Sequence, residues 1–276
     1  MRRLLLICAV ALFGLGGANA QLLPGDYKLF NHLSAGVSVG LDGIGIDVAT
    51  PVTRFLAIRA GYAFMPGIKY STTIDLDGAN TNIFIPNEAR EYKADLKGKL
   101  KMGNFKLLVD FYPFKLSSFH LTVGAYIGKG AVVSAYTPDQ IVKDTYCGNS
   151  GIELGNTNGS IFEHYTLVSD EEGKANIDLK VNGFKPYVGI GFGRAVPKKR
   201  VNVTFDLGVQ FWGTPALWTN VKYLDYYKED YVAGYDKVDK NRITNSKYKD
   251  VKDAIKVGEK IRVYPVLKLT VNGRIF

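Results

Sequence analysis

Eight segments of this chain alternate between apolar residues and small or polar residues, and this period of two restricts its fold most. In the segment 33–41, Leu33, Ala35 and Val37 alternate with Ser34 and Gly36. Successive side chains of a β-strand point to opposite faces, so such a pattern is typical of a strand with one apolar face. The expected strands cover residues 33–41, 44–48, 54–64, 105–114, 120–130, 186–194, 201–213 and 265–276. The sequence therefore predicts an all-β protein.

The connections between these strands differ greatly in length. Short segments that contain proline follow the second, fourth and sixth strands, whereas residues 66–103, 136–182 and 214–260 follow the third, fifth and seventh. Loops longer than about 15 residues are uncommon in compact domains, so three of them on one side are informative. The pattern predicts an antiparallel up-and-down barrel of eight strands, with short turns at one end and long loops at the other.

Two segments within the long connections leave ten strands as an alternative. Residues 90–104 and 174–183 also alternate, and their phase reverses near Gly103 and Gly183. We interpret them as strands that project beyond a membrane and are interrupted by bulges. If they cross the membrane instead, the barrel has ten strands.

The first 20 residues have the pattern of a secretory signal peptide. Arg2 and Arg3 precede an apolar run of residues 4–17, and Ala18-Asn19-Ala20 follows as a cleavage pattern. The run is shorter than the roughly 20 residues that a transmembrane helix needs. We therefore expect a signal peptide at residues 1–20 and a single barrel domain at residues 21–276. That domain contains one cysteine, Cys147, which excludes an intramolecular disulfide.

The net charge is positive but is not distributed as in a nucleic-acid-binding protein. The whole chain has a formal charge of +9, of which Arg2 and Arg3 would leave with the signal peptide. The middle connection is acidic, at Asp170, Glu171 and Glu172, and no basic stripe with interleaved aromatic residues is present. The basic turn at residues 198–200 would face lipid headgroups. We expect no nucleic-acid partner.

Export, alternating strands, a glycine-rich face and the ending "KLTVNGRIF" together resemble the small eight-stranded outer-membrane β-barrels of Gram-negative bacteria, in the outer-membrane-protein-A-type or porin-like superfamily. The resemblance covers nearly all of residues 21–276. It implies a barrel in the outer membrane, reached through the periplasm, with membrane lipid and lipopolysaccharide around it. It also implies that the barrel-assembly machinery reads Phe276 as a terminal signal. The phase of Phe276 differs from that of Leu269 and Ile275, and a bulge near Gly273 would correct it. The alternative is a soluble periplasmic ligand-binding barrel whose faces are reversed.

Charged residues fall on the polar face of the expected strands. An eight-stranded barrel is barely wide enough for its own side chains, and opposite charges inside it would pair. The sequence therefore predicts a plug of salt bridges, with a narrow ion or solute channel as the alternative. The residues of this lumen charge network are Asp47, Arg59, Lys106, Asp110 and Asp206.

Catalysis and cofactor binding find little support in the sequence. His32 and His120 lie near the expected periplasmic ends of strands and His164 in a long loop, none beside a serine and a carboxylate at the outer rim. No cluster has the spacing of metal ligands, and the glycines at 189, 191 and 193 do not match a dinucleotide loop. We predict a protein that is not an enzyme and has no cofactor, with a lipid-modifying barrel enzyme as an alternative.

The third long connection is dense in tyrosine and mixed charge. Tyrosine gives large contact area at low entropic cost, so this composition is typical of a recognition surface for an extracellular ligand or host protein. A membrane-interface belt is an equal alternative. Residues 246–261 have helical spacing and predict a short amphipathic helix over the barrel mouth. We expect loops that serve binding, adhesion or envelope integrity. The tyrosines are Tyr223, Tyr226, Tyr227, Tyr231 and Tyr235.

Overall fold

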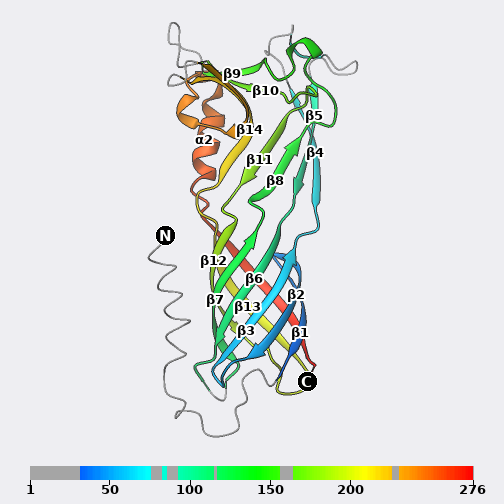
Figure 1. Cartoon of the computed structure of the whole chain (residues 1–276), viewed down its shortest axis with the longest axis vertical. Helices are drawn as coiled ribbons and strands as arrows, with labels where there is room; N and C mark the ends of the chain where they lie inside the picture. Colours follow the sequence, from blue (N-terminus) through cyan, green and yellow to red (C-terminus); the bar gives the residue numbers. More distant parts are fainter. Residues whose placement is uncertain are drawn as a thin grey trace.

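The computed structural model describes residues 32–75, 83–85, 93–114, 117–155, 164–225 and 230–275. It consists of a closed β-barrel and, stacked on one end of it, a second β-sheet that we call the upper sheet (Figure 1). The opposite end of the barrel, where the chain terminates in Figure 1, is called the lower end. Both parts are antiparallel throughout.

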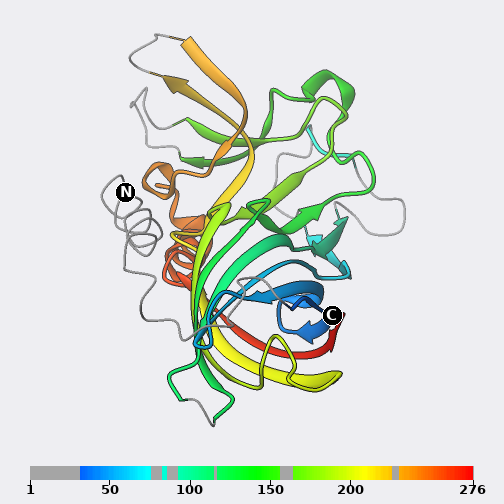
Figure 2. The same cartoon turned by 60° about the horizontal axis from the view of Figure 1, so that its bottom comes forward.

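Eight strands close the barrel, in the order β1-β16-β13-β12-β7-β6-β3-β2. The first strand pairs with the last, which places them side by side in Figure 2. The strands are β1 (Ser34–Gly40), β2 (Gly43–Pro51), β3 (Leu56–Phe64), β6 (Gly103–Phe111), β7 (Phe119–Gly128), β12 (Phe184–Phe192), β13 (Val201–Phe211) and β16 (Val263–Arg274). The predicted eight-stranded barrel is confirmed, and the ten-stranded alternative is wrong.

The last strand remains in register with both neighbours up to its end. Gly273 lies opposite Ala35 of β1 and opposite Val201 of β13, and the pairs on either side follow without a shift. The bulge expected near Gly273 is therefore absent from the described part of β16. Phe276, the predicted assembly signal, lies outside the described residues.

The segments predicted as long loops are largely strands of the upper sheet. Its order is β4-β5-β8-β11-β14-β10-β9, with β15 paired to β14. Five neighbouring barrel strands, β3, β6, β7, β12 and β13, are joined by short segments to β4, β5, β8, β11 and β14 and keep the same order. The strands predicted within residues 90–104 and 174–183 are confirmed as β5 and β11. The other strands of this sheet were not predicted, because alternation resumes, in shifted phase, beyond each interruption. The strands are β4 (Ile68–Asp75), β5 (Lys93–Leu100), β8 (Ala131–Tyr136), β9 (Gly151–Gly155), β10 (Tyr165–Val168), β11 (Asn176–Lys180), β14 (Ala216–Asp225) and β15 (Asp230–Lys237).

Proline and glycine mark the interruptions between the two parts. Between β13 and β14, for example, Gly213 has φ of +75° and Pro215 cannot donate to a ladder hydrogen bond. Beside these breaks lies an apolar cluster, the junction cluster, formed by Met102, Val132, Val181 and Trp212. The ring of Trp212 stacks on Tyr264 with centroids 4.5 Å apart. Apolar packing therefore separates the polar lumen from the upper sheet.

The amphipathic helix expected in residues 246–261 is present as α2 (Lys249–Gly258). It packs against β14 of the upper sheet, as Figure 1 shows at the side of that sheet. Ile255 is the buried residue of α2 and joins a cluster with Leu154, Tyr165, Val221, Val238 and Ile243. In the described part of the chain, no helix combines the length and hydrophobicity needed to cross a membrane.

Candidate functional site

A buried ionic network occupies the centre of the barrel lumen. Arg59 of β3 donates to Asp110 of β6 at 2.8 Å and to Asp206 of β13 at 2.9 Å. His120 of β7 lies with Nε2 3.0 Å from Oδ1 of Asp206, and Thr122 donates to Asp110 at 2.7 Å. Arg59 is 2% exposed and both aspartates are 0% exposed, so water has little access to these charges. The network ties four strands together across the lumen.

A second pair lies nearer the upper sheet. Lys106 of β6 is 2.8 Å from Asp47 of β2, and its Nζ is also 3.5 Å from Oγ of Ser38. Lys185 of β12 donates to Asn104 at 2.8 Å. These contacts continue the polar filling of the lumen toward the junction cluster.

All five residues of the predicted lumen charge network therefore point inward and lie in ion pairs. Sequence reasoning missed Lys185 and Lys268, although both occupy the polar phase of their strands. It placed His120 near a strand end without seeing that Asp206 would lie beside it. Among the described barrel residues, four buried cations match four buried carboxylates: Arg59, Lys106, Lys185 and Lys268 against Asp42, Asp47, Asp110 and Asp206. This balance is what a filled lumen requires.

Glycines leave room for the large lumen side chains. A Cβ added at Gly191 would lie 2.5 Å from Nε2 of His120, and one at Gly189 would lie 2.5 Å from the hydroxyl of Tyr187. Both distances are shorter than a van der Waals contact. The inward glycines Gly189 and Gly191 of β12 therefore leave room for Tyr187 and His120.

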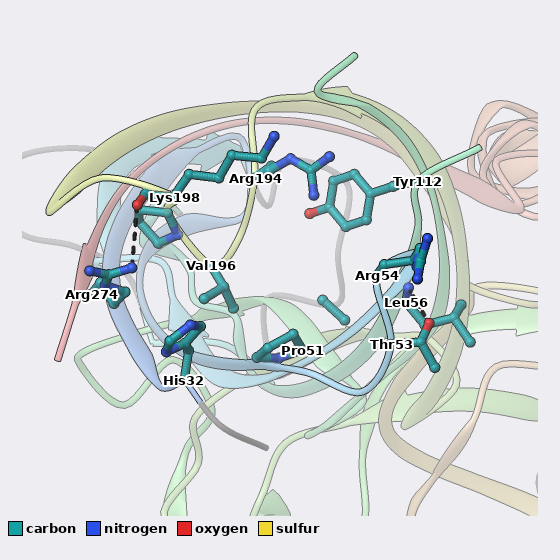
Figure 3. A pocket seen from close by; sticks show the side chains of 12 residues that line it. His32, Pro51, Thr53, Arg54, Leu56, Tyr112, Arg194, Val196, Lys198 and Arg274 are labelled. Atoms are coloured by element: carbon teal, nitrogen blue, oxygen red, sulfur yellow. Dashed lines mark hydrogen bonds between the residues drawn. The ribbon is translucent and has the colours of Figure 1, made fainter. Parts of the chain in front are cut away.

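A cavity of about 330 Å³ opens at the lower end of the barrel, and we call it the basic pocket (Figure 3). Four cationic side chains line it: Arg54 from the β2–β3 turn, Arg194 and Lys198 from the β12–β13 turn, and Arg274 from the end of β16. His32 lies on its wall, and the buried Nδ1 of His32 has no hydrogen-bond partner in the described structure. Among the described residues, no Asp or Glu lines the pocket.

Local contacts hold these cations around the basic pocket. The guanidinium of Arg194 lies 4.9 Å from the ring centroid of Tyr112, and the Tyr112 hydroxyl accepts from the backbone N–H of Ala195 at 3.0 Å. Arg274 donates to the carbonyl of Lys198 at 3.3 Å, which is the dashed line between them in Figure 3. The pocket is thus built by two turns and the last strand.

The predicted tyrosine surface is divided by the structure. Tyr231 and Tyr235 are exposed at 56% and 38% on the outer face of the β14–β15 hairpin. Tyr223 is on the inner face, 5.8 Å from the ring of Tyr165. Tyr226 and Tyr227 lie outside the described residues.

The outer face around Tyr235 is a compact polar and aromatic group. Tyr235 donates a short hydrogen bond to Asp178, and burial together with this carboxylate raises the pKa of Tyr235. The ammonium of Lys180 lies 4.2 Å from the ring centroid of Trp218 and 4.3 Å from that of Tyr235. These contacts order an aromatic patch on three strands, β11, β14 and β15.

The third histidine pairs with a glutamate of the upper sheet. His164 lies 2.7 Å from Glu153 on the exposed edge of the upper sheet. Within the described ranges, no group of three or more His, Cys, Asp or Glu residues is positioned to hold a metal ion.

The fold belongs to the class of closed eight-stranded antiparallel barrels. No protein-family model matches the chain, and no curated protein sequence matches it. Among solved structures, CarO2 of Acinetobacter baumannii is similar at 16% identity and a TM-score of 0.45, over 90% of this chain and 100% of that chain. CarO of the same organism has 16% identity and a TM-score of 0.43, over 90% and 99%. A major outer membrane protein from Thermus thermophilus has 12% identity and a TM-score of 0.34, over 88% and 98%. These values are too low to assign a function, and the class rests on the strand pairing.

Proposed function

We propose that the chain is a non-enzymatic outer-membrane β-barrel that displays the upper sheet outside the cell as a binding surface. The observation that carries this proposal is an exchange of polar and apolar faces at the junction of barrel and sheet. In the barrel the apolar residues face outward, and in the upper sheet they face inward. Such an exchange fits a chain that passes from lipid into water.

Rows of paired residues make the exchange visible. The outermost barrel row toward the upper sheet is Tyr62, Phe105, Ile127 and Phe184, on four adjacent strands. Beyond the interruption, an outward row of the sheet is Lys99, Ser134, Asp178 and Trp218. The inward rows reverse this order: Lys106, Tyr126 and Lys185 in the barrel, then Leu100, Val133, Leu179 and Leu217 in the sheet. A soluble barrel would keep its apolar residues inside throughout.

The outward apolar band has the dimensions of a membrane-spanning barrel. Its longest strands, β13 and β16, have 11 and 12 residues, close to the 9–11 that a tilted strand needs to cross a bilayer. Aromatic residues lie at both borders, as in the girdles of outer-membrane barrels. Phe64, Phe105 and Phe184 border the upper sheet, and Phe111, Phe119 and Phe192 border the lower end. The short turns at the lower end support that end as the periplasmic one.

The filled lumen favours a barrel that does not conduct. Arg59 and its partners occupy the centre, and the junction cluster lies above them. A narrow channel would need a solvent-accessible path along the lumen, and ion pairs that are almost fully buried argue against such a path. Single-channel recording in planar bilayers tests this point. We expect no conductance steps from the folded protein, and regular steps would replace the proposal by the channel alternative.

The aromatic patch on the outer face supports a role in binding. Trp218, Tyr231 and Tyr235 supply contact area on the outer face of the upper sheet, beyond the apolar band of the barrel. The patch would bind an extracellular ligand or a host protein. The barrel itself would contact membrane lipid and lipopolysaccharide. Recognition of Phe276 by the assembly machinery, and membership in the outer-membrane-protein-A-type superfamily, are part of the same proposal.

Gel mobility of an outer-membrane fraction, boiled against unboiled in detergent, tests the membrane assignment. A closed membrane barrel stays folded in detergent and migrates faster unboiled, whereas heating unfolds it. We expect this shift and expect the protein in the outer-membrane fraction. A periplasmic protein without the shift would overturn the proposal in favour of a soluble barrel. The same extract would show whether residues 1–20 are cleaved.

A further inference from the structure

We propose that one side of the protein binds a phosphorylated glycolipid of the lipopolysaccharide type. The site lies on the barrel strands β3 and β6 and on β4 and β5, which continue them above the barrel (Figure 1). A groove on the barrel wall would hold an acyl chain, and lysines beyond the apolar band would hold phosphates of the sugar. This inference rests on the proposed function, which assigns this wall to the outer leaflet.

The groove, which we call the outer-wall groove, lies on the outward face of β1, β2 and β3 and has a volume of about 610 Å³. Its lining includes the small side chains of Ala35 and Ala60. The larger side chains of Val37, Ile46 and Phe105 lie around them and are strongly exposed. An acyl chain in such a groove gains van der Waals contacts that a smooth wall does not offer.

An aromatic pair lies at the upper border of the outer-wall groove. The rings of Tyr62 and Phe105 have centroids 4.9 Å apart. The hydroxyl of Tyr62 reaches Gly103 at the start of β6, since a Cβ added to Gly103 would lie 2.6 Å from it. The ring is thus in the apolar band and its polar tip points toward the upper sheet, as for tyrosines at membrane interfaces. This hydroxyl is positioned to bond the polar part of a lipid whose chain lies in the groove.

Five lysines lie beyond the apolar band above this wall. Lys101 is exposed in the interruption between β5 and β6, and Lys129 is exposed in that between β7 and β8. Lys69 of β4 lies directly opposite Lys99 of β5, and Lys97 lies two residues further along β5. Like charges that face each other across neighbouring strands destabilise a sheet. An anion bound between them would offset this repulsion.

These lysines have no counter-charge in the part of the chain that the structure describes. There, the side chains of all five make no ion pair and no hydrogen bond. Two aspartates on the same outer face have other partners. Asp95 accepts from Thr73 at 3.0 Å, and Asp178 accepts from Tyr235. Phosphate oxygens of a bound lipid would therefore supply charge-assisted hydrogen bonds to free ammonium groups.

The height of the lysines favours a glycolipid over a phospholipid. Lys129 lies two residues beyond Ile127, and Lys101 and Lys99 lie four and six residues beyond Phe105. At about 3.3 Å per residue and a tilt of about 40°, these positions are about 5, 10 and 15 Å above the last apolar row. The headgroup layer of a bilayer adds only about 5–8 Å on each side. Phosphates on the sugars of a glycolipid extend above that layer and can reach all three lysines.

The test titrates glycolipid into nanodiscs that contain the full chain. The nanodiscs consist of phosphatidylcholine with a rising fraction of rough-type lipopolysaccharide, and the midpoint of thermal unfolding is measured. A ligand that binds the folded state raises this midpoint until the site is saturated. Parallel series use dephosphorylated lipopolysaccharide, and phosphatidylglycerol at equal charge. We expect saturable stabilisation by the phosphorylated glycolipid and a much smaller rise with the other two. Equal stabilisation by phosphatidylglycerol would overturn the proposal.

A matched pair of double variants tests the lysines. Lys69→Gln with Lys99→Gln removes two cations of the site, and Lys249→Gln with Lys260→Gln removes the same charge from exposed positions at either end of α2. A basic residue near an anionic membrane surface contributes about fivefold in affinity. The first variant should therefore raise the half-saturating fraction of lipopolysaccharide about 25-fold, and the second less than about twofold. Equal shifts in both would contradict a site at β4 and β5.

A second matched pair tests the outer-wall groove without changing charge. Ala60→Leu fills the groove, and Ala125→Leu adds the same side chain to an outward position of β7 outside it. We expect about threefold weaker binding in Ala60→Leu, from lost van der Waals contacts, and no change in Ala125→Leu. Chemical crosslinking in detergent checks a second copy of the chain as the occupant. A crosslinked dimer that Ala60→Leu abolishes would assign the groove to protein contact and overturn the proposal.

Gel mobility of every sample, boiled against unboiled, separates this proposal from the membrane assignment. If the wild-type protein shows the shift and lipopolysaccharide does not stabilise it, the glycolipid proposal fails while the membrane proposal stands. A periplasmic protein without the shift overturns both. If the Lys69 and Lys99 double variant loses the shift, the single variant Lys101→Gln replaces it, with an expected loss of about fivefold.

Discussion

Five strands of the barrel continue, after short interruptions, into five strands of the upper sheet, yet the apolar faces of the two parts are opposite. In β6 the inward residues Asn104 and Lys106 are buried and polar, whereas in β5 the inward Leu100 continues to an apolar interior. On the outward face, β6 carries the apolar Phe105, whereas β5 carries the charged Lys99. The hydrogen-bonding pattern is the same in both parts, so the surroundings alone explain which face is apolar. Under the proposed function, the junction is therefore the level at which the surroundings of the chain change from lipid to water.

The interiors are stabilised by different interactions as a result. Ion pairs such as Arg59 with Asp110 hold the barrel interior, and burial of apolar side chains such as Ile255 holds the upper sheet. Removing one member of a buried pair is costly because the other charge remains without a partner. Removing a methyl group from an apolar cluster costs less. The two parts should therefore respond differently to substitution.

The largest effect is expected for Arg59→Leu, which leaves Asp110 and Asp206 without their main partner. We expect a loss of about 3–5 kcal/mol in the free energy of unfolding, as for other broken buried pairs. Urea titration of the protein refolded in lipid vesicles measures the free energy of unfolding. The control is Lys199→Leu, at an exposed residue of the β12–β13 turn. A loss no larger than the control's would show that water reaches both aspartates, and would favour a channel.

The next effect compares the outer faces directly. Leu207→Arg places a charge near the middle of β13 on the apolar band, where Leu207 is 46% exposed. We expect it to cost about 2–4 kcal/mol in vesicles, the depth-dependent cost of arginine at the bilayer midplane. Tyr136→Arg, at a residue 42% exposed on the outer face of the upper sheet, should change stability by less than about 0.5 kcal/mol. Equal losses of stability for Leu207→Arg and Tyr136→Arg would show that both outer faces contact water. That result would favour a soluble barrel.

The alternation of residues was enough to predict the barrel, because each strand has one consistently apolar face. Phase alone placed Asp47, Arg59, Lys106, Asp110 and Asp206 on the polar face, and the resemblance to outer-membrane barrels predicted that this face points inside. Their pairing could not be predicted, since it depends on which strands become neighbours across the lumen. His120 and Asp206 are 86 residues apart in sequence and meet only in the closed barrel.

Sequence reasoning found β5 and β11 of the upper sheet, as strands projecting from residues 90–104 and 174–183, and missed the other strands of that sheet. Its strands continue barrel strands after a proline or glycine, and there the phase of alternation shifts, so a fixed pattern loses them. Tyr223 and Tyr235 seemed equivalent as tyrosines of one segment. A hairpin places them on opposite faces, because its register and not its composition decides which face each takes. The basic pocket is formed by separate turns and had no contiguous signal in the sequence.

A smaller effect, confined to the upper sheet, is expected for Ile255→Ala. The change truncates the buried side chain that packs α2 against the sheet. It should lower the free energy of unfolding of the upper sheet by about 2 kcal/mol, the low end of the range for Ile→Ala in a core, because the cluster lies near the surface. Limited proteolysis of residues 240–262 in intact protein measures the loosening of α2. The barrel's mobility shift on gels should stay unchanged, and Val257→Ala, at an exposed residue of α2, is the control. Loss of the barrel's shift would mean that both parts unfold as one unit.

The smallest effect is a pH dependence of the upper sheet. Burial raises the pKa of Tyr165 to about 12, and its hydroxyl accepts from the backbone N–H of Asp239 at 3.0 Å. The folded state favours the neutral phenol, so this contribution is complete below about pH 10, the ordinary pKa, and is lost as the pH rises to about 12. Fluorescence of Trp218 in a Trp212→Phe background reports the sheet. We expect a change over that interval which is smaller in Tyr165→Phe. An identical fluorescence change with and without Tyr165→Phe would assign the transition to another group, such as Tyr235, whose pKa is also raised. The substitutions described above would then be the only test of the difference between the two interiors.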